Sequence, residues 1–279
     1  MKHTFDFSIA FFFVAFFLLV SPDLLAEQRS GIFPAGHKPE GWVFALSLVL
    51  GLFSALAVHE LGHLLTGLAL GFRFELFVVF LLGVKRTGNG VRLYLNRNLG
   101  YMGGVAATFP TKKDPKNRMR FAYMVLAGPI ASLFFAIACF WFVTYTKNQL
   151  WSFWLFAGTT SIGVFLATTI PAKSGIFFTD RARFQRLISR GPQGKSEEAL
   201  LQIIAQTTTD NSSKNISLED AWLLQADKEP FMQFWGYYYE YDFFKANENA
   251  QLAEQARLRL IKLKDVISKP IWKALKIEG

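Results

Sequence analysis

The sequence contains little cysteine, histidine and charge for its length. Its single cysteine, Cys139, lies within an apolar run, which excludes a disulfide framework and a cysteine-based zinc site. Any metal must therefore be bound by carboxylates and by the four histidines, His3, His37, His59 and His63. Only 18% of the 279 residues are charged and 52% are hydrophobic, which is too apolar for an ordinary soluble domain. The composition favours a membrane protein.

Four uncharged stretches are candidate membrane spans. They are residues 7–22, 41–58, 121–146 and 148–172. A helix needs about 20 residues to cross the hydrocarbon, so the last two are long enough. The second resumes its apolar pattern after its first ionisable groups, and we expect one helix over residues 42–72. We favour an uncleaved helix for the first, because residues 24–26 are a poor signal-peptide cleavage site.

The distribution of basic residues predicts the orientation of these spans. Residues 73–120 contain ten Lys and Arg but only two acidic residues, so this segment is expected in the cytoplasm. The second and fourth spans then both run toward the cytoplasm. The net charge of +9 suits an anionic membrane surface, and we expect membrane lipid as a partner. We expect no nucleic-acid partner, because the basic residues follow hydrophobic segments rather than forming one recognition element.

The most informative motif is the run His59-Glu60-Leu61-Gly62-His63 in the second apolar segment. On a helix, His59 and His63 are one turn apart on the same face, so both imidazoles can bind one tetrahedral Zn²⁺ ion. Glu60 projects about 100° around the helix and can act as the catalytic base for a water molecule. Ionisable groups at this depth cost at least ~2.5 kcal/mol each, which favours this interpretation over histidines satisfied by neighbouring helices in a transporter-like core.

The third protein ligand must come from elsewhere in the chain. No histidine follows His63, and Glu75 lies only twelve residues beyond it, at the start of a predicted strand. The remaining candidate is Asp180, which follows the fourth span after a break marked by proline and glycine. The predicted topology places it at the same cytoplasmic end as the histidines. The alternative is a surface aspartate paired with Arg181 or Arg183.

Together these features resemble the site-2 protease family of intramembrane zinc metalloproteases. The resemblance covers about residues 42–186, and it rests on the histidine motif, on residues 171–180 and on the run Ala127-Gly128-Pro129-Ile130-Ala131-Ser132. It implies that Asp180 is the third ligand of one Zn²⁺ ion. It also implies that the substrate is a transmembrane protein or peptide. The link over residues 147–150 is too short for a PDZ-like domain, so we expect a member without one.

Three positions depart from the family's pattern. Arg181 stands where the family usually has glycine, and Thr168 and Ser132 stand where it often has asparagine. These departures concern substrate-holding contacts more than the metal site, and the substrate-binding residues are not assigned. The departures at Arg181 and Thr168 motivate an alternative function, a catalytically inactive relative that binds transmembrane segments. A metalloprotease that cuts soluble chains at the membrane surface is a further alternative.

A β-hairpin is predicted between the second and third spans. Residues 76–84 and 91–95 flank an Asn89-Gly90 turn, and the resemblance implies a membrane-associated sheet whose edge accepts the substrate backbone. The alternative is a surface hairpin without substrate contact. Gly104, in a glycine pair, either permits a close backbone approach or marks a turn. Gly128 and the following proline similarly predict either a kink that permits close packing or plain helix packing.

The last part of the chain is polar and amphipathic. After residues 191–194 we expect three or four cytosolic helices over residues 196–276, one of which begins with Ser217 and Asp220 as a capping pair. These helices could form a hairpin array resembling tetratricopeptide repeats. The aromatic residues between positions 231 and 244 form either the core of this part or a groove for a cytosolic partner or a substrate.

The sequence therefore predicts a mainly α fold, a polytopic bundle of about four transmembrane helices. Residues 1–40 would form the first helix and an external loop, residues 41–190 the metalloprotease core, and residues 191–279 a cytosolic helical domain. The expected function is intramembrane zinc-dependent endopeptidase activity in or near a transmembrane segment of a membrane protein. The protein is expected in the cell membrane, with its active site toward the cytoplasm.

Overall fold

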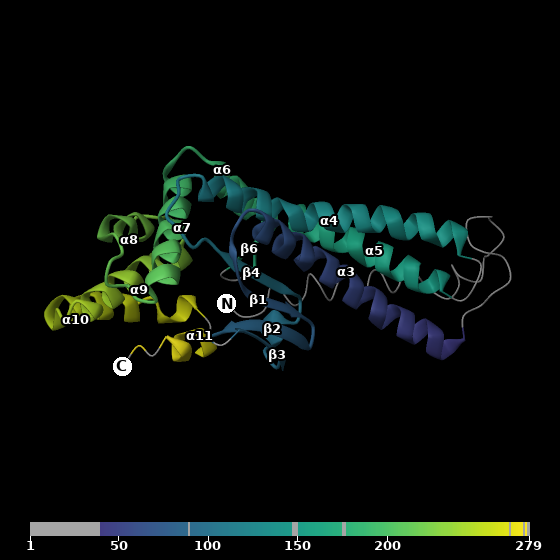
Figure 1. Ribbon diagram of the computed structural model, residues 1–279, viewed down its shortest axis with the longest axis horizontal. Coiled ribbons are helices and arrows are strands. Elements are labelled where there is room, and N and C mark those ends of the chain that lie inside the picture. The colour runs from purple at the N-terminus through teal and green to yellow at the C-terminus, as the bar shows by residue number, and fades with distance from the viewer. Residues whose placement is uncertain are drawn as a thin grey trace. The chain divides into compact units, whose positions relative to one another are not determined.

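The computed structural model describes residues 40–88, 90–146, 150–174, 177–267, 269–275 and 277, with the elements labelled as in Figure 1. These residues form two compact units, each built from segments distant in the sequence. The first unit comprises residues up to His63 together with 77–106 and 127–180, and the second comprises 64–76, 107–126 and 181–279. The predicted helix over residues 7–22 and the predicted turn residue Asn89 lie outside the described residues.

Three helices of the described chain are long and apolar enough to cross a membrane. They are α3 (Gly41–Ala69), α4 (Asn117–Tyr145) and α5 (Trp151–Thr169). Three of the four predicted spans are thus found as long apolar helices. Only 17–33% of the most apolar 18-residue window in each helix is buried by protein, as expected of helices that are solvated by lipid.

Helix α3 continues without interruption through the histidine motif and ends at Ala69, three residues earlier than expected. It ends because Gly71 adopts a left-handed conformation, with φ of 85°. The amide of Gly71 donates to the carbonyl of Leu68 at 3.0 Å, and the amide of Phe72 donates to that of Gly67 at 2.9 Å. This pair of bonds satisfies carbonyl groups that the helix end would otherwise leave without donors.

Between α3 and α4 the chain forms a four-stranded sheet, where the sequence predicted a single hairpin. The predicted strand over residues 76–84 is divided by a turn at Phe80, whose φ is 54° and whose carbonyl accepts a hydrogen bond from Asn96 Nδ2 at 2.9 Å. The strand order is β3-β2-β1-β4, and β2 and β3 pair antiparallel as the expected hairpin. The strands are β1 (Arg73–Val79), β2 (Leu82–Thr87), β3 (Gly90–Leu95) and β4 (Val105–Phe109).

The segment after α5 is extended, as its proline predicted. Ile170, which precedes Pro171, is extended with ψ of 120° and ends the helix. Two short strands follow, β5 (Lys173–Ser174) and β6 (Phe177–Phe178), which pair antiparallel. Thr179 closes this loop, because its hydroxyl donates to the carbonyl of Ile170 at 2.9 Å. Helix α6 (Asp180–Ile188) begins at the next residue, Asp180.

Five helices follow α6 in the described chain, one more than the upper end of the prediction. They are α7 (Pro192–Asp210), α8 (Leu218–Gln225), α9 (Pro230–Ala246), α10 (Ala250–Ile261) and the short α11 (Lys269–Ala274). Helix α7 begins earlier than predicted, because Pro192 is well suited to the first helical position. The predicted cap is confirmed, since the side chain of Ser217 accepts from the amide of Asp220 at 3.3 Å.

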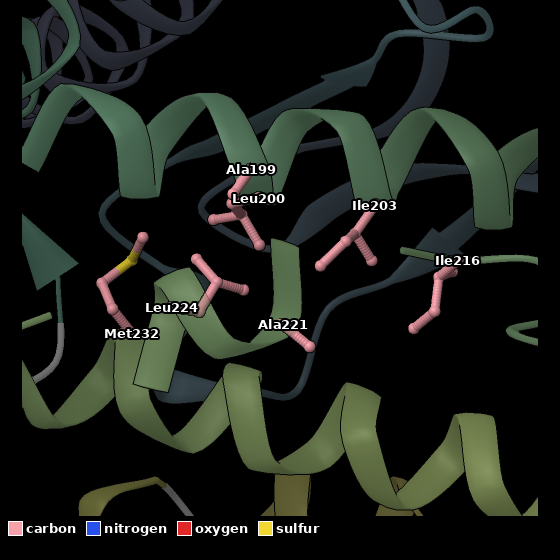
Figure 2. Close-up of a cluster of buried hydrophobic side chains, with 7 residues drawn as sticks. All are labelled: Ala199, Leu200, Ile203, Ile216, Ala221, Leu224 and Met232. Carbon is pink, nitrogen blue, oxygen red and sulfur yellow. The ribbon is translucent and has the colours of Figure 1, made fainter. Parts of the chain in front are cut away.

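Two buried clusters hold these helices together. In the first, side chains of α7, such as Leu200 and Ile203, face Leu224 of α8 (Figure 2). The second is centred on α9, where Phe234 and Tyr241 are buried and most other aromatic side chains between positions 231 and 244 pack against one of the clusters. The structure thus favours the core interpretation of the aromatic residues. It gives no support to the alternative of a partner groove.

A buried ionic network connects α6 to α7 and to the turn between α8 and α9. The guanidinium of Arg186 contacts a carboxylate oxygen of Glu197 at 2.7 Å and one of Asp227 at 2.7 Å. Arg183 contacts the second carboxylate oxygen of Glu197, also at 2.7 Å. Because the side chains of Arg186, Glu197 and Asp227 are at most 5% exposed, loss of one partner would leave a buried charge without compensation.

We therefore expect Asp227→Asn to lower the free energy of unfolding by about 3 kcal/mol, because Arg186 loses one of its two charged partners. Denaturation of the purified chain in detergent measures this effect. The matched control is Glu254→Gln, which breaks an ion pair with Arg257 in which the glutamate is 52% exposed. The control is expected to change stability far less, and equal effects of the two substitutions would contradict the network's role.

Candidate metal centre

The two motif histidines and Asp180 lie together within the first unit. His59 and His63 are one turn apart on α3, and both present Nε2 to the same carboxylate oxygen of Asp180. The chain reaches this point because the extended segment after α5 ends at Asp180, the first residue of α6. Among the described residues this is the one group of histidine, cysteine or acidic side chains whose geometry suits a metal ion.

The distances between the three potential ligand atoms fit a tetrahedral zinc ion. His59 Nε2 lies 3.2 Å from Asp180 Oδ2, His63 Nε2 lies 3.5 Å from the same oxygen, and the two nitrogens are 3.3 Å apart. Ligands about 2.0–2.1 Å from a tetrahedral zinc are about 3.3 Å from one another. The three atoms could therefore share one zinc ion with little rearrangement.

The environment of the Asp180 carboxylate also suits a cation. Its Oδ2 atom is buried and faces the two imidazole Nε2 atoms without a well-formed hydrogen bond, an arrangement that is costly unless a positive group compensates it. Burial raises the pKa of Asp180, but the two imidazoles lower it by more, and the resulting pKa is about 2. The carboxylate is therefore ionised at neutral pH, which is the form that binds a metal.

Two glycines let α3 and α4 approach closely beside the histidines. A Cβ atom at Gly62 would lie 2.7 Å from the carbonyl oxygen of Ala127, and one at Gly128 would lie 2.3 Å from His63 Nε2. Real Cβ contacts are essentially never that short, so only glycine fits at either position. The structure shows that Gly128 permits close packing of α4 against α3, the helix that carries the two imidazoles.

Glu60 is buried next to the first residues of β4. A Cβ atom at Gly104 would lie 2.6 Å from Glu60 Oε1, and the backbone of Ala106 forms a hydrogen bond with the carboxylate. Gly104 also has φ of 106°, which a glycine adopts without strain. Both alternatives for this glycine therefore apply, because it turns the chain and also brings the backbone against Glu60.

The sequence did not predict that Ser132 contacts one of the histidines. Ser132, taken as a departure in substrate-holding contacts, lies 3.0 Å from Nδ1 of His59 through its hydroxyl and is fully buried. The signal in the sequence was its position one helical turn beyond Gly128 on α4. That spacing places the two residues on one face, but it could not show that the face meets the histidines.

The alternative for Asp180, a surface aspartate paired with arginine, is not favoured by the geometry. Its side chain is 21% exposed and faces the imidazoles. Arg183 instead pairs with Glu197, and its guanidinium also lies over the ring of Phe121. The structure thus brings together His59, His63 and Asp180, with Glu60 beside them, as the sequence predicted.

Comparison with known proteins gives one match. The model of peptidase family M50 matches residues 47–273, which include the histidine motif, Asp180 and most of the C-terminal helices. No curated protein and no solved structure matches the chain. The matched range extends well beyond the region of residues 42–186 on which the sequence resemblance was based.

The close approach at Gly128 leads to a test of the site. Gly128→Ala would push His63 away, and we expect bound zinc to fall at least about tenfold, since a histidine ligand is displaced. The measurement is the zinc content of protein purified in detergent. The matched control is Gly158→Ala, whose Cβ would meet Cys139 Cβ at 3.0 Å, away from the imidazoles. Unchanged zinc in Gly128→Ala would contradict the packing argument.

Proposed function

Because this chain belongs to peptidase family M50, the site-2 protease family, we propose that it is an intramembrane zinc metalloendopeptidase. Its substrate would be another membrane protein, cut at a peptide bond in or near a transmembrane segment. The observation that carries the proposal is the convergence of two imidazole nitrogens and one buried carboxylate oxygen beside Glu60. Zinc bound there would act as a Lewis acid that polarises the substrate carbonyl and makes water a nucleophile near neutral pH.

Glu60 performs the proton transfers in this proposal. Its carboxylate takes a proton from the attacking water as the water oxygen bonds to the carbonyl carbon of the substrate. The bond between that carbon and the amide nitrogen then breaks, and Glu60 returns the proton to the departing amine. Gly104 and Ala106 restrict the carboxylate on one side, so Glu60 is held in one orientation next to the histidines.

The sheet offers a place for the substrate backbone. Strand β4 lies at one edge of the four described strands, and it begins at Val105, directly after the glycine that contacts Glu60. An edge strand has free amide and carbonyl groups that can pair with an extended peptide. We infer that the substrate adds to β4, which would place its backbone next to Glu60. A helical substrate must unwind first, because its carbonyls are already hydrogen-bonded.

The proposed location is the cell membrane, with the site toward the cytoplasm. Three apolar helices support the membrane assignment. The orientation rests on the ten basic residues between positions 73 and 120, which favour the cytoplasmic side. The C-terminal helices would then lie in the cytosol.

The central test is Glu60→Gln. We expect cleavage to fall by about 10²- to 10⁴-fold, because the proton acceptor is lost, while bound zinc stays near one equivalent. Asp180→Ala is expected instead to lose zinc together with activity. Peptides that accumulate in membranes of cells with wild-type but not Glu60→Gln protein identify the substrate, and its purified form then gives the rates.

This comparison also separates the alternatives. An inactive relative that only binds transmembrane segments would bind zinc or a segment but show no turnover in either protein. Turnover that is equal in wild-type and Glu60→Gln protein would exclude Glu60 as the base. Cleavage of soluble chains alone would favour an enzyme that works at the membrane surface.

The requirement for an extended substrate gives a separate prediction. Placing a glycine near the scissile bond of the identified substrate should speed cleavage several-fold, because glycine costs about 1 kcal/mol in a helix relative to alanine. An alanine or leucine at the same position serves as the control. Initial rates at low substrate concentration measure the effect, and identical rates would argue against unwinding before cleavage.

A further inference from the structure

The buried hydroxyl of Ser132 has no role in the proposed reaction, but it contacts His59, one of the proposed metal ligands. It lies 3.0 Å from Nδ1 of His59, on the opposite side of the ring from the Nε2 atom that faces Asp180. Ser132 is on α4 and His59 is on α3, so the contact joins two of the apolar helices. Both side chains are buried, Ser132 fully and His59 to 5% exposure, so water cannot readily substitute for either partner.

The direction of this hydrogen bond follows from the chemistry of the ring. A neutral imidazole that binds metal through Nε2 must carry its proton on Nδ1. Nδ1 is then a donor, and the serine oxygen accepts from it. The bond therefore selects the tautomer of His59 that leaves Nε2 free as a ligand, and it fixes the plane of the ring.

Ser132 is itself held in place by the third apolar helix. The hydroxyl of Ser161, on α5, donates to the backbone carbonyl of Ser132 at 2.9 Å, and Ser161 is also fully buried. The chain of contacts from Ser161 through Ser132 to His59 thus connects all three helices at the depth of the metal site. Such anchoring limits the movement of the hydroxyl that the imidazole requires.

We propose that Ser132 is a positioning residue, which orients His59 for metal binding and fixes its tautomer. The proposal rests on the proposed metal site but not on peptidase activity. It assigns the serine a different role from the substrate contact that its place in the family's pattern suggested. Outer hydrogen-bond partners of metal-binding histidines typically contribute about 10- to 100-fold to metal affinity.

The test measures zinc affinity of the full chain in detergent by competition with a chelator of known affinity. We expect Ser132→Ala to raise the zinc dissociation constant by about 10- to 100-fold. Ser132→Thr keeps the hydroxyl and should restore the affinity to within about threefold of wild type, since the acceptor is retained. The absorption spectrum of the Co²⁺-loaded protein gives a second readout, because it reports ligand geometry, and it should change in Ser132→Ala.

The matched control is Ser152→Ala. Ser152 on α5 donates to Ser47 on α3 at 2.9 Å, so the substitution removes another buried bond between apolar helices without touching an imidazole. It should leave zinc affinity and the Co²⁺ spectrum unchanged. A general loss of helix packing would instead affect both alanine variants alike.

Three results would overturn the positioning role. These are wild-type zinc affinity in Ser132→Ala, equal weakening in Ser132→Ala and Ser132→Thr, or a rise in KM alone with zinc affinity unchanged, which would indicate a substrate contact. In each case wild-type protein that still binds zinc leaves the proposed function standing. Wild-type protein that binds no zinc would overturn both proposals.

Discussion

The proposed metal site depends on a close approach of two apolar helices, α3 and α4, beside the imidazoles of His59 and His63. Gly62 and Gly128 remove the side chains that would otherwise separate α3 from α4, and the space gained lets the α4 backbone pack against His63. In lipid there is little hydrophobic drive for helices to associate, so small residues and polar contacts determine where they meet. The same contact places Ser132 behind His59. A short helix–helix distance thus also sets the geometry of the proposed metal ligands.

Ionisable groups in such a bundle are costly unless they compensate one another. At least ~2.5 kcal/mol is lost for each charged side chain placed at the centre of a membrane. His59, His63 and Asp180 converge on one point, where a divalent cation would balance the carboxylate. The C-terminal helices also contain buried charged side chains. There Arg186 is buried between two carboxylates, so the charges neutralise one another without any bound ion.

The four-stranded sheet lies next to Glu60, the proposed catalytic base. Its edge strand β4 begins where the backbone turns at Gly104 against Glu60, so the Glu60 carboxylate and the edge strand are neighbours. The one hairpin that the sequence predicts here corresponds to β2 and β3. Strand β4 was not predicted, because residues 105–109 contain two alanines and no alternation of apolar and polar side chains. The turn at Phe80 was not predicted either, since a bulky residue rarely adopts a positive φ.

The sequence by itself determined the apolar helices and the histidine pair, because both depend on short-range patterns. The apolar runs around α3, α4 and α5 exceed what a soluble core needs, and a spacing of four puts His59 and His63 on one helix face whatever surrounds them. The predicted topology and the family resemblance already indicated Asp180, but only the tertiary structure brought its carboxylate to the histidines and decided which hydroxyl supports them. Asp180 is more than a hundred residues from His63, and Ser132 lies on another helix, so their contacts depend on packing and loop closure that no local pattern encodes.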